Sequence, residues 1–305
     1  MLAFLVNPAV IGLCALFLAI VWMLRDERDR TRPLLVIALV LNLAYGWVLS
    51  FVMGKENGLV PWKYDYVLFH LDDALGLRAA PIAAWLQFAR IPLFVLYQLM
   101  VPMMIAWFLV ARRAGKPAAI ILAYVTEMVT GPLLYAVVPG CGPVYAFHKQ
   151  WLSPPAVAPI AIKLSGMPNA FPSLHLATAL VFVLFAPTRL TRAIAVTFLF
   201  GTALATLSTG EHYLIDLVAG LAFGCFAWAA GCRKVGVALG FAGLALAWCL
   251  TVRFGSGFLL EHPEFLKMSA GATVLAVAVT VIRGWLDAEP APHLTDAGAL
   301  LEHRK

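Results

Sequence analysis

The sequence predicts an all-α polytopic membrane protein, and three observations support that prediction. Hydrophobic residues make up 62% of the 305 residues and charged residues only 12%, whereas a soluble domain normally carries about 25% charged residues. The mean hydropathy is +0.88. The apolar residues also form long runs, and a helix needs about 20 of them to cross a bilayer.

Nine apolar runs are candidate transmembrane helices, so we expect about nine spans. No basic segment precedes the first run, and four arginines follow it, which predicts a retained anchor rather than a signal peptide. No repeat or soluble second domain is evident, and residues 286–305 are predicted to form a short cytoplasmic tail. The runs cover residues 7–24, 34–53, 91–110, 118–138, 172–187, 193–209, 212–231, 235–252 and 268–283.

The distribution of lysine and arginine predicts the orientation in the membrane. On alternate loops one side receives 14 of the 22 basic residues, mostly in short loops, and this side is expected to be cytoplasmic. The N-terminus is then outside and the C-terminus inside, in the inner membrane if the protein is bacterial. The 14 residues are Arg25, Arg28, Arg30, Arg32, Arg112, Arg113, Lys116, Arg189, Arg192, Arg233, Lys234, Arg283, Arg304 and Lys305.

The net charge of +6 therefore reflects membrane topology. No basic stripe with interleaved aromatic residues is present, so we expect no nucleic-acid partner. Of the five cysteines only Cys141 falls in an outside loop, and we expect no disulfide there.

Three outside segments are long enough to contribute to function: residues 54–90, 139–171 and 253–267. In the first, Tyr64, Leu68, Leu71 and Leu75 repeat at helical spacing. This predicts an amphipathic helix lying in the membrane interface, with an ordinary solvated loop as the alternative. Its polar residues are Asp65, Asp72 and Asp73, and its aromatic residues at headgroup depth are Trp62, Tyr64 and Tyr66.

The second outside segment, 139–171, is rich in proline and glycine and cannot be one continuous helix. It can fold over helix ends and line a pocket. It brings four polar residues to the outer face: Tyr145, His148, Lys149 and Lys163.

Few acidic residues lie in the predicted spans, and ionisable groups there are functional candidates. Asp216 lies four residues after His212, on the same helical face, so its carboxylate can orient the imidazole. The alternative is a pair that only stabilises the helix end. Glu211 lies at the start of the same helix. Glu127, deep in the fourth helix, has no clear partner and can be a packing residue.

The stretch Phe-Pro-Ser-Leu-His opens the fifth predicted helix on the outer side. Pro172 suits the first position of a helix, and Ser173 and His175 follow in its first turn. Free N–H groups and the helix dipole attract an anion there. Because His212 and Asp216 start a second outward-facing helix, the set predicts a phosphate site with a nucleophile and an acid. A metal site built from His175, His212 and Asp216 is the less favoured alternative.

At these residues the chain resembles the phosphatidic acid phosphatase type 2 superfamily, which carries a Pro-Ser-x-His motif and a later His-x-x-x-Asp motif. Here they read Pro172-Ser-Leu-His175 and His212-Tyr-Leu-Ile-Asp216. The resemblance implies a six-helix core over residues 34–231. It leaves residues 1–33 as an anchor with its basic loop and residues 232–285 as two additional helices. It also implies that His212 is the nucleophile, Asp216 its orienting carboxylate, His175 the general acid and Ser173 a phosphate contact.

Two departures from the superfamily pattern affect the expected substrate. The phosphatase branch carries a Lys-x6-Arg-Pro motif that has no match here, and its Ser-Arg is Ser208-Thr209 in this chain. Such a variant is similar to the inositol phosphorylceramide synthase and sphingomyelin synthase branch. Candidate substitutes for the missing cations are Lys163, then Lys149 and His148, with Tyr145 in the same segment.

The expected function is transfer of a phosphoryl or phospho-headgroup, inositol phosphate-like, from a membrane lipid to a lipid, an alcohol or water, without a cofactor or metal. A lipid-phosphate phosphatase acting on phosphatidic acid or a polyprenyl diphosphate is the alternative within this class. A transporter with a His and Asp path, which would include Glu127, and an inactive lipid-binding relative are alternatives from other classes.

Overall fold

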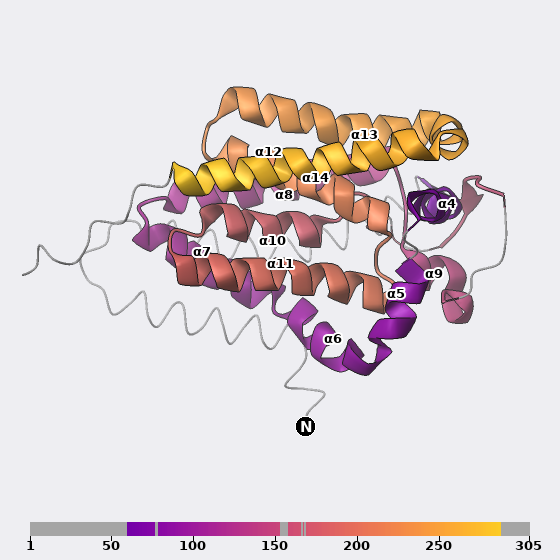
Figure 1. Ribbon diagram of the computed structural model, residues 1–305, viewed down its shortest axis with the longest axis horizontal. Helices are drawn as coiled ribbons and strands as arrows, with labels where there is room; N and C mark the ends of the chain where they lie inside the picture. The colour runs from indigo at the N-terminus through magenta and orange to yellow at the C-terminus, as the bar shows by residue number, and fades with distance from the viewer. Residues whose placement is uncertain (1–59, 77–78, 153–157, 166, 168, 288–305) are drawn as a thin grey trace, which may run out of the picture.

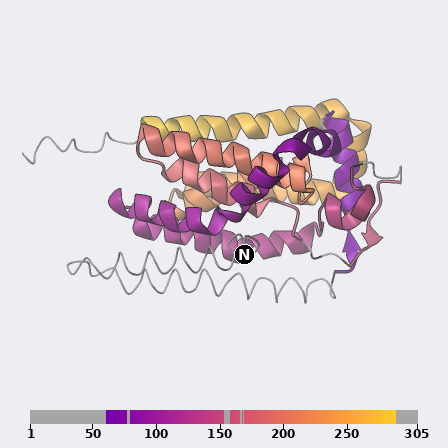
Figure 2. The same ribbon diagram turned by 90° about the horizontal axis from the view of Figure 1, so that it is seen from below.

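The computed structural model describes residues 60–76, 79–152, 158–165, 167 and 169–287 (Figure 1). The predicted spans 7–24 and 34–53 lie outside these residues. The long helices run side by side along one axis, as two perpendicular views show (Figures 1 and 2). The helices are α4 Asp65–Leu75, α5 Ala79–Trp85, α6 Arg90–Gln98, α7 Met100–Arg113, α8 Pro117–Val137, α9 Pro143–Phe147, α10 Leu174–Phe185, α11 Arg189–Thr209, α12 Leu214–Gly231, α13 Val235–Glu261 and α14 Pro263–Leu286.

Five of the described helices are long and apolar enough to cross a membrane: α8, α11, α12, α13 and α14. The segment Pro81–Gln98, which ends with α6, adds a sixth candidate if it forms one span with α7, and α10 is apolar but has only 12 residues. Short 3₁₀ segments at Leu86–Ala89 and His148–Gln150 and the antiparallel pair of β1 (Trp62–Lys63) with β2 (Ile162–Lys163) complete the architecture. The prediction of an all-α polytopic membrane protein is confirmed, whereas the number nine stays a prediction.

Two predicted boundaries differ from the structure. Residues 253–267 are not an outside loop, because α13 continues to Glu261 and α14 begins at Pro263. Arg253 stays inside α13 since its guanidinium donates to the carbonyl of Val137 and lies 5.7 Å from the ring of Tyr64. The run 91–110 is not one straight helix either, since a 49° bend separates α6 from α7.

The core forms around α12, which packs against α8, α10, α13 and α14. Two glycines one turn apart allow α10 to approach its backbone. A Cβ atom at Gly220 would lie 2.6 Å from the carbonyl oxygen of Ser173, and one at Gly224 would lie 2.7 Å from that of Ala177. Small residues at this spacing are typical of close helix contacts in membranes. The start of α10 is therefore held directly against α12.

We expect Gly220→Ala to lower the melting temperature of the detergent-solubilised protein, because the added methyl group must push Ser173 away. Overpacking of this kind costs about 1–3 kcal/mol. The matched control is Gly243→Ala in α13, where a Cβ atom meets nothing within 4 Å. The control should leave stability unchanged or raise it slightly, since alanine is the better helix former. Equal melting temperatures for the two variants would contradict the role given to Gly220.

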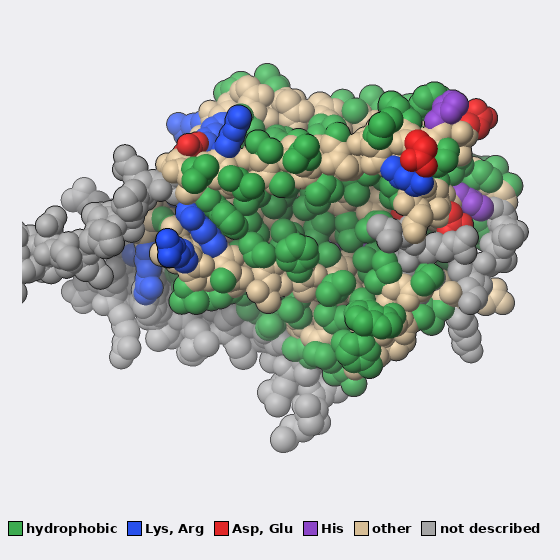
Figure 3. Space-filling view, viewed as in Figure 1, with side chains coloured by type: hydrophobic (Ala, Val, Ile, Leu, Met, Phe, Trp, Pro, Cys, Tyr) green, Lys and Arg blue, Asp and Glu red, His purple; other side chains and the backbone are tan. Residues whose placement is uncertain are grey.

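Charged side chains gather at the two ends of the molecule, with an apolar band between them (Figure 3). The basic end contains the starts of α8 and α11 and the ends of α12 and α14. There a Cβ atom at Gly231 would touch Ala119, and Arg192 donates to the carbonyl oxygen of Trp285. The predicted topology places the basic loops from Arg112 to Arg283 on one side of the membrane. In the structure these loops lie at the same end of the molecule.

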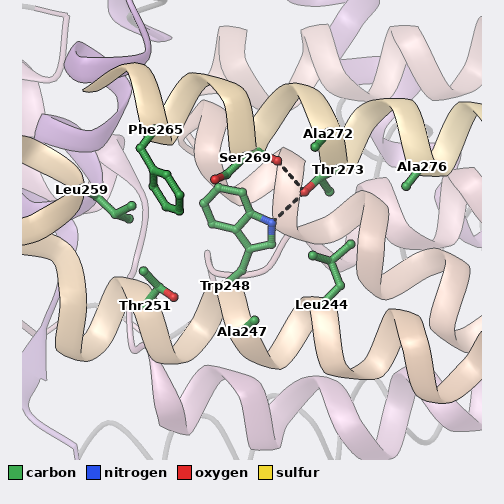
Figure 4. A pocket seen from close by; sticks show the side chains of 10 residues that line it. All are labelled: Leu244, Ala247, Trp248, Thr251, Leu259, Phe265, Ser269, Ala272, Thr273 and Ala276. Carbon is green, nitrogen blue, oxygen red and sulfur yellow. Dashed lines mark hydrogen bonds between the residues drawn. The ribbon is translucent and has the colours of Figure 1, made fainter. Parts of the chain in front are cut away.

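A cavity of about 490 Å³ lies between α13 and α14 (Figure 4). Two of its polar side chains are hydrogen-bonded: Trp248 Nε1 donates to Thr273 Oγ1 over 3.1 Å, and that hydroxyl donates to the carbonyl of Ser269 over 2.9 Å. The rest of the lining is mostly hydrocarbon. The lining residues are Leu244, Ala247, Trp248, Thr251, Leu259, Phe265, Ser269, Ala272, Thr273 and Ala276.

Candidate active site

The starts of α10 and α12 lie against each other at the end opposite the basic loops. Ser173 is the N-cap of α10 and His175 lies in its first turn. His212 precedes α12, and Asp216 lies in the first turn of that helix. The backbone N–H of Ser173 donates to the carbonyl oxygen of Asp216 over 3.0 Å. The structure thus brings together the four residues that the two motifs single out.

Among the described residues, the imidazole of His212 is hydrogen-bonded through one of its two nitrogens. Its Nδ1 lies 2.9 Å from the carbonyl oxygen of Ala170 and 3.4 Å from Asp216 Oδ2. A carbonyl only accepts hydrogen bonds, so Nδ1 carries the hydrogen and, in the neutral ring, Nε2 keeps its lone pair. The Ala170 carbonyl is nearer than the carboxylate, and sequence reasoning missed it because no residue type encodes a backbone acceptor.

Asp216 holds the backbone of Tyr213 as well as the imidazole of His212. Its Oδ2 also accepts the backbone N–H of Tyr213 over 2.8 Å, which closes the turn that leads into α12. Its Oδ1 is buried and has no hydrogen-bond partner among the described residues. The carboxylate therefore holds both the imidazole and the backbone next to it.

His175 faces His212 across the site. The two ring centroids lie 6.1 Å apart, with the ring planes at 66°. No group of three or more His, Cys, Asp and Glu side chains within the described ranges is arranged to hold a metal ion. The metal-site alternative thus finds no ligand cluster in this part of the chain.

The first two N–H groups of α10 and of α12 differ in whether a side chain already accepts them. At α12, Asp72 accepts the N–H groups of Leu214 over 2.8 Å and Ile215 over 2.9 Å. At α10, the N–H groups of Leu174 and His175 occupy the first two helical positions, which have no intrahelical acceptor. An anion between the helices can therefore be bound by backbone amides from α10 but not by those two amides of α12.

The helix that the sequence predicts in the first outside segment is present as α4, and its place in the membrane interface stays a prediction. Asp65 and Asp72 are both buried. Asp65 accepts hydrogen bonds from the N–H groups of Cys141 (3.1 Å) and Gly142 (2.9 Å) and from the hydroxyl of Tyr213 (3.1 Å). Burial raises the pKa of Asp65 to about 6, although these hydrogen bonds act in the opposite direction. α4 therefore fastens the loop at 139–142 to the start of α12.

The segment 139–171 folds over the start of α12, as predicted. The N–H of Val144 donates to the carbonyl of Gly210 over 2.9 Å. Gly142 has a φ of +89°, and a Cβ atom there would collide with the backbone of Glu211. The Tyr145 hydroxyl donates to Glu211 Oε1 over 3.1 Å. Burial, with the nearby Glu211 carboxylate, raises the pKa of Tyr145 to about 12.

The basic residues predicted to contact the phosphate lie later in the segment 139–171, from residue 148 onward. Lys163 is exposed on β2, with its Nζ 5.4 Å from the ring of Trp62. His148 is exposed at a turn with a φ of 50°. The side chain of Lys149 lies outside the described residues. Binding of substrate by Lys163 and His148 stays a prediction.

Ser208 and Thr209 occupy the place of the superfamily's Ser-Arg pair. Both hydroxyls donate to the carbonyl of Ala205 in their own helix, over 3.0 and 2.9 Å. They extend the hydrogen bonding of α11 and supply no positive charge to the site.

Glu127 is a buried link between α8 and α10. Thr178 lies 2.8 Å from Glu127 Oε2 and 3.0 Å from the carbonyl oxygen of Leu174. The Thr178 hydroxyl donates to the Glu127 carboxyl group on α8 or to the Leu174 carbonyl in its own helix. This arrangement agrees with the packing role that the sequence left open for Glu127.

One residue beside the site has no sequence signal. Tyr97, at the end of α6, stacks on His175 with ring centroids 4.4 Å apart. It belongs to an apolar run and to no motif, so only the folded chain relates it to His175.

A family model described as the PAP2 superfamily matches residues 67–230, which is more than half of the chain. No curated protein and no solved structure matches the chain significantly. The matched range contains both motifs and the helices α6 to α12. The chain belongs to the PAP2 superfamily, whose members are phosphatases or phosphotransferases that act on phosphate esters.

Proposed function

We propose that the protein is an integral membrane lipid phosphotransferase that uses His212 as its nucleophile. The observation that best supports this is the state of the His212 ring, whose Nδ1 is bonded to the Ala170 carbonyl while Nε2 is available beside His175. Attack of Nε2 on phosphorus would form a phosphohistidine. Asp216 and the Ala170 carbonyl orient the ring, and the carboxylate stabilises the positive charge that develops on it.

The phosphate is proposed to bind at the open start of α10. Donors there are the N–H groups of Leu174 and His175 and the hydroxyl of Ser173, whose oxygen already accepts the N–H of Leu176 over 3.4 Å. His175 acts as the general acid that protonates the leaving oxygen. Tyr145, His148 and Lys163 are the proposed contacts to the rest of the substrate.

A phosphodiester donor suits this site better than a phosphomonoester. Glu211 precedes the nucleophile, and its carboxylate is only partly buried. Ser208 and Thr209 stand where the superfamily has an arginine. A diester carries one negative charge where a monoester at neutral pH carries about 1.5–2, so it needs less cationic compensation. This favours transfer of a phospho-headgroup, inositol phosphate-like, as in the inositol phosphorylceramide synthase and sphingomyelin synthase branch.

The site is proposed to face the extracytoplasmic side. The starts of α10 and α12 lie at the end of the bundle opposite the basic side chains, and basic loops are typically cytoplasmic (Figures 1 and 3). The lipid donor and acceptor would then reach it from the outer leaflet.

The test is incubation of the purified protein with a panel of lipids labelled with ³²P in the headgroup phosphate, with and without a lipid alcohol as acceptor. We expect a new labelled phospholipid that depends on the acceptor. Release of free phosphate regardless of acceptor would instead indicate a lipid-phosphate phosphatase. Absence of any labelled product across the panel, together with movement of intact lipid or protons, would favour a transporter.

A further inference from the structure

Tyr97 lies at the bend of the α6–α7 span and contacts the proposed general acid. α6 ends at Gln98 and α7 begins at Met100, and the segment Pro81–Gln98 is bent by 49° from α7. The Tyr97 ring stacks on His175 with an interplanar angle of 30°, and its hydroxyl lies 3.2 Å from His175 Nδ1. Both contacts are made to the imidazole ring itself.

The position of Tyr97 is fixed by its neighbour on α6. Leu96 packs onto α11 at Gly201, where a Cβ atom would lie only 2.7 Å from the Leu96 side chain. α6 therefore rests against α11, and Tyr97, one residue later, is held over α10.

Each contact helps His175 to present a proton in one direction. A Tyr97 hydroxyl that donates to Nδ1 places the proton of the neutral imidazole on Nε2, the nitrogen left to meet a substrate oxygen. The stacked Tyr97 ring restricts rotation of the imidazole. A general acid needs both a proton and a fixed direction.

We propose that Tyr97 is a positioning residue for His175, an inference that rests on the proposed function of the site. In the first step His212 Nε2 forms a bond to phosphorus while the bond from phosphorus to the leaving oxygen breaks. The leaving oxygen takes the bonding electron pair and the Nε2 proton of His175. In the second step the acceptor hydroxyl attacks phosphorus, gives its proton back to His175 and releases His212. Tyr97 holds His175 in both steps.

The test uses Tyr97→Phe, which keeps the stacked ring and removes the hydroxyl. The first step, followed as release of the leaving group in a single turnover, is compared for two diesters with the same phospho-headgroup, one esterified to a lipid alcohol and the other to p-nitrophenol. We expect the rate with the lipid alcohol to fall about tenfold, which is less than the 10²–10⁴-fold that acid catalysis contributes, because His175 itself is retained. The rate with p-nitrophenol should change less than about twofold, since this leaving group departs without a proton.

The matched control is Tyr124→Phe. It removes a hydroxyl on α8 that donates to the Met104 carbonyl on α7. It should leave both rates unchanged. Equal losses with the two esters in Tyr97→Phe would mean a structural role, and no loss with either would mean that the hydroxyl does not serve His175. Either result overturns the inference. Turnover that survives His212→Ala would instead overturn the proposed function itself.

Discussion

His212→Ala should lose phosphoryl transfer by at least about 10⁴-fold, since loss of the attacking group disables the whole reaction. His212→Asn should be equally inactive while remaining the better-folded variant. Its side-chain amide can still donate to the Ala170 carbonyl, which Nδ1 contacts over 2.9 Å, but it lacks a nucleophilic nitrogen. The measurement is turnover of a labelled lipid, together with covalent labelling of the protein that is stable to base and labile to acid.

The control for His212 is His262→Ala, at the exposed turn between α13 and α14. This variant should retain both turnover and the covalent label. The mechanism would be refuted by near-normal turnover in His212→Ala, provided that size-exclusion chromatography shows both His212 variants to be folded.

Asp216→Asn should lower kcat by about 10²-fold with little change in KM. The amide oxygen of asparagine can still accept the N–H of Tyr213, and the Ala170 carbonyl still holds His212 Nδ1, so the geometry survives. The negative charge that stabilises a positively charged His212 is lost. In a Ser-His-Asp triad the same change lowers kcat by about 10⁴-fold. We expect a smaller loss here because the Ala170 carbonyl also fixes the tautomer of His212.

A matched control for this charge change is Asp287→Asn, exposed at the far end of α14. It should behave as wild type in kcat and KM. A loss in Asp216→Asn as complete as in His212→Ala would mean that the Ala170 carbonyl cannot hold the imidazole alone.

The apolar runs predicted most of the described helices well, because membrane helices are selected by local hydropathy. Prediction failed where a distant partner decides the structure. Arg253 ends the apolar run in the sequence, yet α13 continues through it, since the Val137 carbonyl and the Tyr64 ring receive the charge. No local pattern contains that information.

The motif residues could be found from the sequence because their chemistry depends on fixed local spacing, four residues from His212 to Asp216. The residues that hold these motif residues in place could not be found from the sequence. Asp72 caps a helix that starts 142 residues later, and Tyr97 reaches His175 over 78 residues. One support had a signal that could have been used: Gly220 and Gly224 form a small-xxx-small pair typical of close helix packing.

The hydrogen bonds of Asp65 set a lower limit on the piece of this protein that could be excised and studied alone. The family match begins at residue 67, two residues after this carboxylate. A fragment that begins there would leave the amides of Cys141 and Gly142 and the hydroxyl of Tyr213 without their acceptor, Asp65. Each stranded buried donor costs about 1–3 kcal/mol. A minimal catalytic unit should therefore start upstream of Trp62, so that it retains β1 as well as α4.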